Sequence, residues 1–132
     1  HAVRMLSKLT PVLFLDSIET ALPFFNERLK FETVATVPVR EGSDELGFAI
    51  LVRDDVELML QTRASVRGDL PQFADEPNRA FLYLEVADVD AIARDLRGAD
   101  VVVPRRTTFY GADEIGVRAP GGHVLVFAQR KG

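Results

Sequence analysis

Cysteine is the first residue type that this sequence lacks, since none occurs among its 132 residues. Its absence excludes disulfide bonds, catalysis by a thiolate and zinc sites built from cysteine. Long apolar runs are also missing: none approaches the roughly 18 residues that a membrane-spanning helix needs, and the N-terminal stretch does not resemble a signal peptide. We therefore expect a cytoplasmic protein without a membrane partner.

An excess of positive charge is absent as well. The formal net charge is −4 and the isoelectric point is about 5.2. A nucleic-acid partner is therefore not expected, because contacts to phosphates require a basic surface. The remaining composition, with 47% hydrophobic and 27% charged residues, is ordinary for a globular protein. A chain of this length is expected to form one domain with a proper core.

The clearest local pattern is a turn between two strands near the C-terminal end. Residues 114–118 and 124–128 have the composition of strands. Between them lies Ala119-Pro120-Gly121-Gly122, in which proline presets one φ angle and glycine tolerates positive φ. The pattern predicts a hairpin with a specific turn.

The predicted elements form an order that occurs twice along the chain. In each half, an apolar strand leads to an acidic helix start, an amphipathic helix and further strands. The first half has a strand at 9–15, a helix starting at Asp16-Ser17, and strands at 31–37, 48–52 and 56–62. The second half has a strand at 80–86, a helix from Asp88 to Leu96 that stops at Gly98, a short strand at 100–103 and the hairpin. This duplication is the most informative feature of the sequence.

We expect one domain over residues 1–132, built from two β-α-β-β-β modules. The first module covers residues 8–62 and the second covers residues 80–130. Residues 63–79 hold a glycine and two prolines among charged residues and are expected to form a linker.

Two stretches, LDSIETALPFFNERLKF at 15–31 and YGADEIGVRAPGGHVLVF at 110–127, make this sequence similar to the vicinal oxygen chelate superfamily. That group includes glyoxalases, bleomycin-resistance-type binding proteins and dioxygenases. Many members have Asp-Pro-Asp-Gly-His where this chain has Ala119-Pro120-Gly121-Gly122-His123. The resemblance implies an α+β fold in which two modules form a U-shaped cup of mixed sheets. It also implies helices outside the cup, and a ligand or metal inside it.

The resemblance further implies four metal-ligand positions, two at the starts of the modules' first strands and two in their last strands. Aligning the helix starts and the turns of the two modules places these positions at Thr10, Met59, Phe81 and Val126. Enzymes of the superfamily have histidine and glutamate there, whereas Met, Phe and Val offer no oxygen or nitrogen donor. We expect no metal site, no cofactor and no catalytic residue of the usual kind.

Side-chain alternation along the strands predicts which residues line the cup, because every second residue of a strand faces the same side. In 56–61 the aliphatic residues Val56, Leu58 and Leu60 are expected to face the helices, which leaves Glu57, Met59 and Gln61 for the cup. The same reasoning on the other strands, together with the hairpin, gives the expected ligand-binding set. This set comprises Thr10, Phe14, Phe48, Glu57, Met59, Gln61, Phe81, Tyr83, Glu85, Tyr110, Glu114 and Val126.

These residues also have simpler interpretations. The aromatic side chains and Met59 could fill the cup as core. The three glutamates could be solvated, or paired with arginine on a neighbouring strand, because a carboxylate is rarely buried unpaired. His123 directly follows the turn, where a lone exposed histidine is usually structural or solvated, and Arg105-Arg106 is expected to be a solvated pair in a loop.

The sequence favours a metal-independent small-molecule-binding protein of the bleomycin-resistance type. Its ligand would be partly aromatic, as some antibiotics are, stacked on Phe14, Phe81 and Tyr83. Any positive group on the ligand would be held by the glutamates. The resemblance also makes a homodimer the expected partner state.

Two other functions remain open. One is a glyoxalase- or dioxygenase-like lyase or isomerase with an atypical or absent metal site, using Glu57, Glu85, Glu114 or His123. The other is a regulatory module, whose cup would be filled by its own side chains. The ligand, the pathway, and whether the cup forms within one chain or across a dimer are not determined by the sequence.

Overall fold

The computed structural model describes residues 3–131 as eight strands and several short helices. The strands are β1 (Val12–Leu15), β2 (Glu32–Pro38), β3 (Leu46–Arg53), β4 (Val56–Thr62), β5 (Phe81–Glu85), β6 (Asp100–Thr107), β7 (Ala112–Arg118) and β8 (Val124–Arg130). The α-helices are α1 (Ile18–Pro23), α2 (Arg63–Asp69) and α3 (Val89–Asp95). A π-helical turn (Phe24–Arg28) continues α1, and short 3₁₀ turns occupy Pro71–Phe73 and Pro120–Gly122.

The strands form two sheets with the same topology. The first sheet has the order β1-β4-β3-β2 and the second has the order β5-β8-β7-β6. In each sheet the first strand pairs in parallel with the last strand of the module, and the other pairings are antiparallel. The expected α+β fold of two β-α-β-β-β modules is therefore confirmed.

The predicted helix starts are confirmed by their caps. The Ser17 hydroxyl accepts a hydrogen bond from the backbone N–H of Thr20 at 3.2 Å, and the Asp88 carboxylate accepts one from Ala91 at 3.1 Å. Each cap satisfies a backbone donor that the first turn of a helix leaves free. Gly98, with φ of 83°, ends the segment after α3 in the left-handed region that glycine tolerates.

Three boundaries differ from the sequence-based expectation. Residues 63–79 are not irregular throughout, because Thr62 caps α2 by accepting from the Ser65 N–H, and Val66 packs fully buried. β1 begins only at Val12, and residues 3–11 before it form an extended arm. β6 continues to Thr107 through Pro104, which an edge strand accommodates because one of its sides needs no ladder hydrogen bonds.

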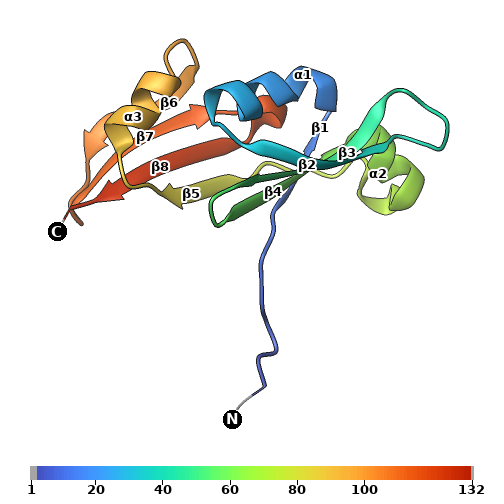
Figure 1. Cartoon of the computed structure of the whole chain (residues 1–132), viewed down its shortest axis with the longest axis horizontal. Coiled ribbons are helices and arrows are strands. Elements are labelled where there is room, and N and C mark those ends of the chain that lie inside the picture. The colour runs from blue at the N-terminus through green and yellow to red at the C-terminus, as the bar shows by residue number, and fades with distance from the viewer. Residues whose placement is uncertain (1–2, 132) are drawn as a thin grey trace.

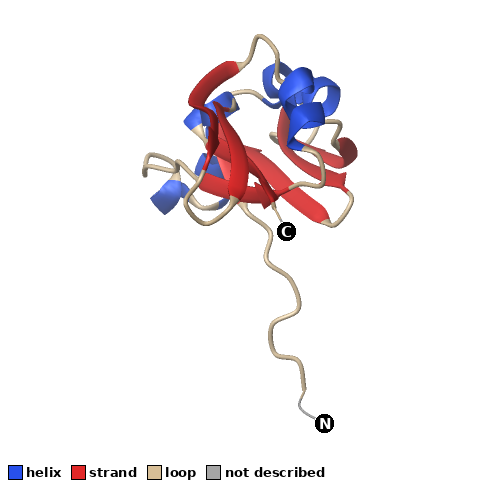
Figure 2. Ribbon diagram, turned by 90° about the vertical axis from the view of Figure 1, so that its left-hand side faces the viewer, coloured by secondary structure: helices blue, strands red, loops and turns tan. Residues whose placement is uncertain are grey.

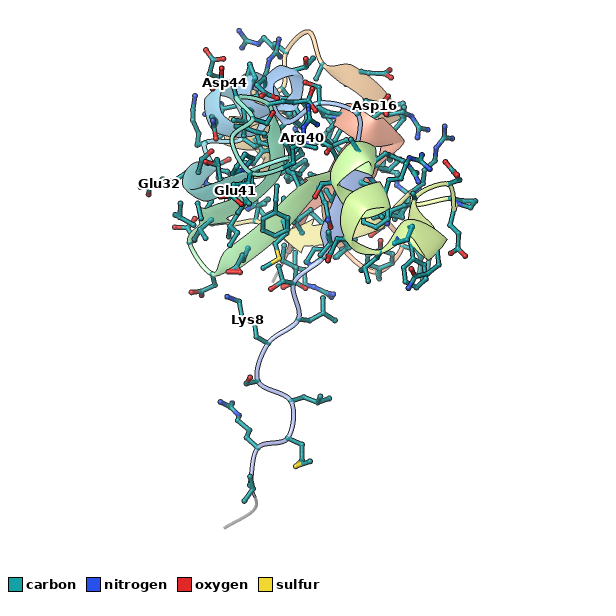
Figure 3. All side chains as sticks on the ribbon, turned by 90° about the vertical axis from the view of Figure 1, so that its right-hand side faces the viewer. Lys8, Asp16, Glu32, Arg40, Glu41 and Asp44 are labelled. Carbon is teal, nitrogen blue, oxygen red and sulfur yellow. The ribbon has the colours of Figure 1, made fainter. Side chains whose placement is uncertain are left out.

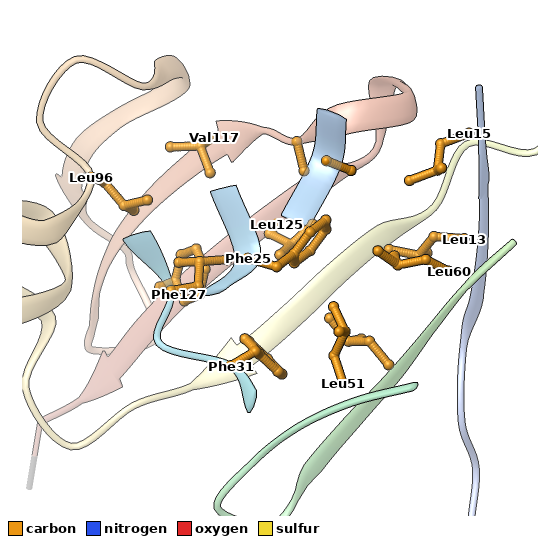
Figure 4. Close-up of a cluster of buried hydrophobic side chains, with 14 of the residues drawn as sticks. Leu13, Leu15, Phe25, Phe31, Leu51, Leu60, Leu96, Val117, Leu125 and Phe127 are labelled. Atoms are coloured by element: carbon orange, nitrogen blue, oxygen red, sulfur yellow. The ribbon is translucent and has the colours of Figure 1, made fainter. Parts of the chain in front are cut away.

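The two sheets share a single apolar core. Figure 4 shows Phe25 between side chains of both modules, with Leu13 and Leu60 on one side and Leu125 and Phe127 on the other. All five side chains are at most 3% exposed. Alternation in the strands explains the arrangement, since the aliphatic set of each strand faces the helices.

Helices α1 and α3 lie on the same side of the two sheets, and the N-terminal arm leaves on the opposite side (Figure 1). Figure 2 shows the arm extending away from the rest of the molecule in a second view. The sheet faces opposite α1 and α3 are called the open faces from here on. Within residues 3–131, the helices are too short to cross a membrane.

His123 joins the two modules. Its side chain is fully buried, its Nδ1 accepts a hydrogen bond from the Ala80 N–H at 2.9 Å, and its Nε2 lies 2.8 Å from the carbonyl oxygen of Phe14. Because a neutral histidine has one donor and one acceptor nitrogen, these contacts assign the proton to Nε2. The expectation of an exposed turn residue is wrong, and the contacts support a structural role.

The pKa of His123 lies below its ordinary value of 6.5, first because of burial and also because of the nearby charges of Arg63 and Arg79. The hydrogen bond to Phe14 opposes this shift without cancelling it. Below about pH 6.5 the unfolded chain binds a proton that the folded chain does not. The contribution of His123 to stability is therefore complete above that pH and is lost as the pH falls toward the lower, folded-state pKa.

We predict that the free energy of unfolding of the native protein falls between pH 7 and pH 5, and that the His123→Gln variant loses part of this dependence. The variant should also be less stable at pH 7 by roughly 1–3 kcal/mol, because the Ala80 N–H and the Phe14 carbonyl lose good partners. Urea unfolding of both proteins at pH 5, 6 and 7 measures the effect. Equal slopes against pH would contradict the role given to His123.

Candidate functional site

The open face of the first module is covered in part by the chain itself. Strand register places Phe14 and Phe48 on either side of Gln61, and Met59 next to them on the same face. All four side chains are half-buried. Gln61 donates to the hydroxyl of Ser65 in α2 at 3.1 Å. These side chains of the open face are therefore partly covered or hydrogen-bonded within the chain, which leaves less of them for contact with a ligand.

Two cations of the chain add to this cover. The Arg63 guanidinium lies 5.5 Å from the centre of the Phe14 ring, a distance that allows a cation–π contact. Lys8 lies in the arm, where Figure 3 labels it. Its Nζ atom forms an ion pair with a carboxylate oxygen of Glu57 at 2.6 Å. Thr10 lies half-buried in the arm before β1.

The open face of the second module exposes aromatic side chains. Phe81, Tyr83 and Tyr110 are 69%, 42% and 46% exposed, although their ring systems are among the largest apolar groups in the chain. Val126 lies beside Tyr83 in the sheet register and is buried. Alternation in β5 is as expected, with Leu82 and Leu84 packed against the core on the other side.

A buried carboxylate lies next to these aromatic rings. Glu114 is only 2% exposed; it accepts a hydrogen bond from the Tyr110 hydroxyl at 2.5 Å and another from Nε of Arg106 at 3.0 Å. The hydrogen bond from Tyr110 is the main cause that lowers the pKa of Glu114, and Arg106 lowers it further. The same bond raises the pKa of Tyr110. Glu114 therefore stays ionised and Tyr110 stays protonated at neutral pH.

All three glutamates of the expected set are paired with cations of the same chain. Besides Glu57 with Lys8 and Glu114 with Arg106, Glu85 accepts from Nε of Arg130 at 2.7 Å. The interpretation as carboxylates paired with arginine on a neighbouring strand is therefore confirmed for Glu85 and Glu114, whereas Glu57 pairs with a lysine of the arm instead. In the free protein, none of the three offers an unpaired negative charge.

The interpretation of Arg105-Arg106 as a solvated loop pair is wrong. Both residues lie in β6, where they face opposite sides. Arg105 binds Asp90 in the first turn of α3 at 2.7 Å, whereas Arg106 binds Glu114 on the open face. Sequence reasoning missed Arg106 and Arg130 as site residues. A longer strand at 100–107, read with a period of two from Asp100, would have placed Arg106 on the open face, but its pairing with Glu114 depends on register shifts in β6.

The four positions that the resemblance implies for metal ligands, Thr10, Met59, Phe81 and Val126, do not fit a metal in this chain. The register supports the alignment of the modules: Met59 pairs with Val12, two residues after Thr10, and Val126 pairs with Tyr83, two residues after Phe81. Threonine, methionine, phenylalanine and valine do not form a site for a divalent ion. Within residues 3–131, no three His, Asp or Glu side chains gather as a metal site.

The expected ligand-binding residues form two groups rather than one enclosed cavity. A cavity of about 1080 Å³ at the end of β1 includes only Phe14 of the set. A second cavity, of about 400 Å³, includes only Glu85. Phe81, Tyr83, Glu85, Tyr110, Glu114 and Val126 instead share the open face of the second module. The aromatic rings of this group remain accessible to a ligand.

Known proteins with this architecture are numerous. The sequence model described as Glyoxalase/Bleomycin resistance protein/Dioxygenase superfamily matches residues 8–127. No curated protein sequence matches this chain. Among solved structures, a glyoxalase/bleomycin resistance protein/dioxygenase from Nocardioides is 20% identical, covers 98% of this chain and 86% of its own, and has a TM-score of 0.75.

Two further structures carry different functional names. Lactoylglutathione lyase from Agrobacterium tumefaciens is 16% identical, with 93% of this chain and 92% of that chain covered and a TM-score of 0.71. A bleomycin resistance determinant encoded on the transposon Tn5 is 20% identical, with 96% and 100% covered and a TM-score of 0.66. At these identities the likeness shows the fold alone, so it does not distinguish a lyase from a binding protein.

We predict that Tyr110→Phe raises the pKa of Glu114. The variant removes the hydrogen bond that stabilises the ionised carboxylate most, while the aromatic ring remains. Titration of the glutamate side-chain carboxyl signals by ¹³C NMR measures the shift. Tyr83→Phe serves as the control and should change the pKa less, because the Tyr83 hydroxyl contributes less to the shift. An unchanged pKa in Tyr110→Phe would contradict the assigned network.

Proposed function

Because this chain belongs to the Glyoxalase/Bleomycin resistance protein/Dioxygenase superfamily, we propose that it binds a small molecule with an aromatic part, without a metal at the superfamily's usual site. The observation that carries the proposal is the exposure of Phe81, Tyr83 and Tyr110 together on one sheet face. Contiguous exposed aromatic surface is unfavourable in water and commonly marks a binding site.

The open face of the second module would bind such a ligand by stacking and by hydrogen bonds. Aromatic rings at Phe81 and Tyr83 offer flat surfaces to a planar group. The ion pairs and the Tyr110–Glu114 hydrogen bond hold the neighbouring polar groups in fixed positions. Because Glu57, Glu85 and Glu114 already have cationic partners in the chain, we do not propose a positively charged group on the ligand.

The pKa values support binding over proton transfer. A general acid or base works best when its pKa lies near the working pH. The shared hydrogen bond moves the pKa of Tyr110 up and the pKa of Glu114 down, so both values move away from neutrality. His123, another of the four residues considered for a lyase or isomerase, uses both ring nitrogens for backbone contacts.

We also propose that a second copy of the chain covers apolar side chains left exposed by the first. The arm presents Val3, Met5, Leu6 and Leu9, each at least 82% exposed. Exposure of so many large apolar side chains favours association. A regulatory module with a self-filled cup is less well supported, because Phe81 and Tyr83 remain accessible. A cytoplasmic location stays a prediction.

We predict that the untagged protein is a metal-free homodimer. Native mass spectrometry gives the mass of the assembly and of any co-purified organic molecule, and elemental analysis of the same preparation gives the metal content. A monomer would contradict the proposed association. One divalent metal per chain would instead contradict the assignment of the ligand positions and favour the enzyme.

We predict that the double variant Phe81→Ala/Tyr83→Ala loses roughly tenfold or more in affinity for an aromatic ligand, because two stacking surfaces are removed. The probe is 1-naphthalenemethanol, whose fluorescence is read with little background because the chain has no tryptophan. Phe73→Ala is the matched control. Phe73 is 42% exposed, as Tyr83 is, but it lies in the 3₁₀ turn Pro71–Phe73 and not on this sheet face. Equal affinities of the double variant and the native protein would contradict the proposed face.

A further inference from the structure

One of the two ion pairs on the open face of the second module is strongly asymmetric. In the pair between Arg106 and Glu114, the glutamate side chain is 2% exposed and the arginine side chain is 57% exposed. In the pair between Arg130 and Glu85 the two side chains are exposed to a similar degree, 60% and 61%. A molecule that approaches this face therefore meets the Arg106 side chain rather than that of Glu114, whereas it meets Arg130 and Glu85 to a similar degree.

Both arginines use the same nitrogen for their internal partner. Arg106 donates through Nε to Glu114, and Arg130 donates through Nε to Glu85. Among residues 3–131, their terminal Nη groups donate no hydrogen bond to the chain. The two Nη groups of an arginine form a planar fork that matches the two oxygens of a carboxylate.

The free donors lie beside the aromatic rings. Arg106 and Tyr110 bind opposite oxygens of the same Glu114 carboxylate. Arg130 pairs with Glu85 in β5, two residues after Tyr83; Glu85 is the main cause that raises the pKa of Arg130, and Tyr83 and Tyr110 lie close enough to add to this shift. Stacking surface and free guanidinium groups are thus neighbours on one face.

We infer that the small molecule bound at this face is an aromatic carboxylate, with its ring on Phe81 and Tyr83 and its carboxylate on the Nη groups of Arg106, assisted by Arg130. The inference rests on the proposed function, because it assigns the chemistry of a ligand at the proposed site. Glu114 and Glu85 position the two arginines through their Nε atoms, and the arginines provide the charge selectivity.

Three naphthalene probes of similar shape test the inference: 1-naphthoate, neutral 1-naphthalenemethanol and the cation of 1-naphthylmethylamine. Dissociation constants are measured by fluorescence at pH 7.5 and low salt. The anion should bind at least about tenfold more tightly than the neutral probe, because a charge-assisted bidentate contact is stronger than a neutral hydrogen bond. The cation should bind most weakly.

Arginine variants distinguish the effect of the guanidinium charge on affinity from the effect of the aromatic face. Arg106→Gln should lower the affinity for 1-naphthoate to about that of the neutral probe, and it should lower the affinity for the neutral probe by a much smaller factor. Arg106→Lys keeps the charge but loses the fork, so it should give an intermediate affinity. Arg130→Gln should cause a smaller loss. Arg105→Gln is the matched control, because Arg105 is the neighbour of Arg106 in the chain and its own side chain binds Asp90 on the other side of the sheet.

The possible results distinguish the inference from the proposed function. One possible result is that the neutral probe binds to the native protein but not to the Phe81→Ala/Tyr83→Ala variant, while the anion binds no more tightly than the neutral probe. In that case the inference is wrong, and the proposed binding face is supported. An equal loss for all three probes in a folded Arg106→Gln variant would also overturn the inference. If none of the probes binds, both the inference and the proposed function fail.

Discussion

Packing of both sheets against one apolar core is the interaction on which the rest of this structure depends. The core takes one face of each sheet, together with α1, the π-helical turn and α3. Because side chains alternate along a strand, covering one face with aliphatic residues leaves the other set of side chains on the open face. The helices therefore determine which residues a ligand can reach.

The two modules are held in a fixed relation by buried polar contacts as well as by the core. His123 connects Phe14 in β1 with Ala80 just before β5, and Asn78 accepts from the Phe14 N–H. A buried polar group without a partner is costly, so these contacts favour one arrangement of the modules. The ends of β1 and of the late hairpin are thereby brought together.

The fold could be predicted from the sequence because its signals are local. Strand alternation, the helix caps at Ser17 and Asp88 and the glycines after Pro120 depend on neighbouring residues in the chain, and the structure confirms these elements. The repeated order of elements then indicated two similar modules. The assignment of Glu57, Met59 and Gln61 to one face followed from the same alternation, and the register agrees with it.

The charge pattern of the open face needed the tertiary structure. Arg106 and Glu114 are partners only because β6 lies beside β7, and Arg130 reaches Glu85 because β8 lies beside β5. The burial of His123 depends on the contact between modules, and α2 depends on the packing of Val66. The sequence by itself therefore determined the modules and their alternating faces, since these follow from local backbone preferences. Only the tertiary structure decided which charges neutralise one another, because that depends on distances between segments far apart in the chain.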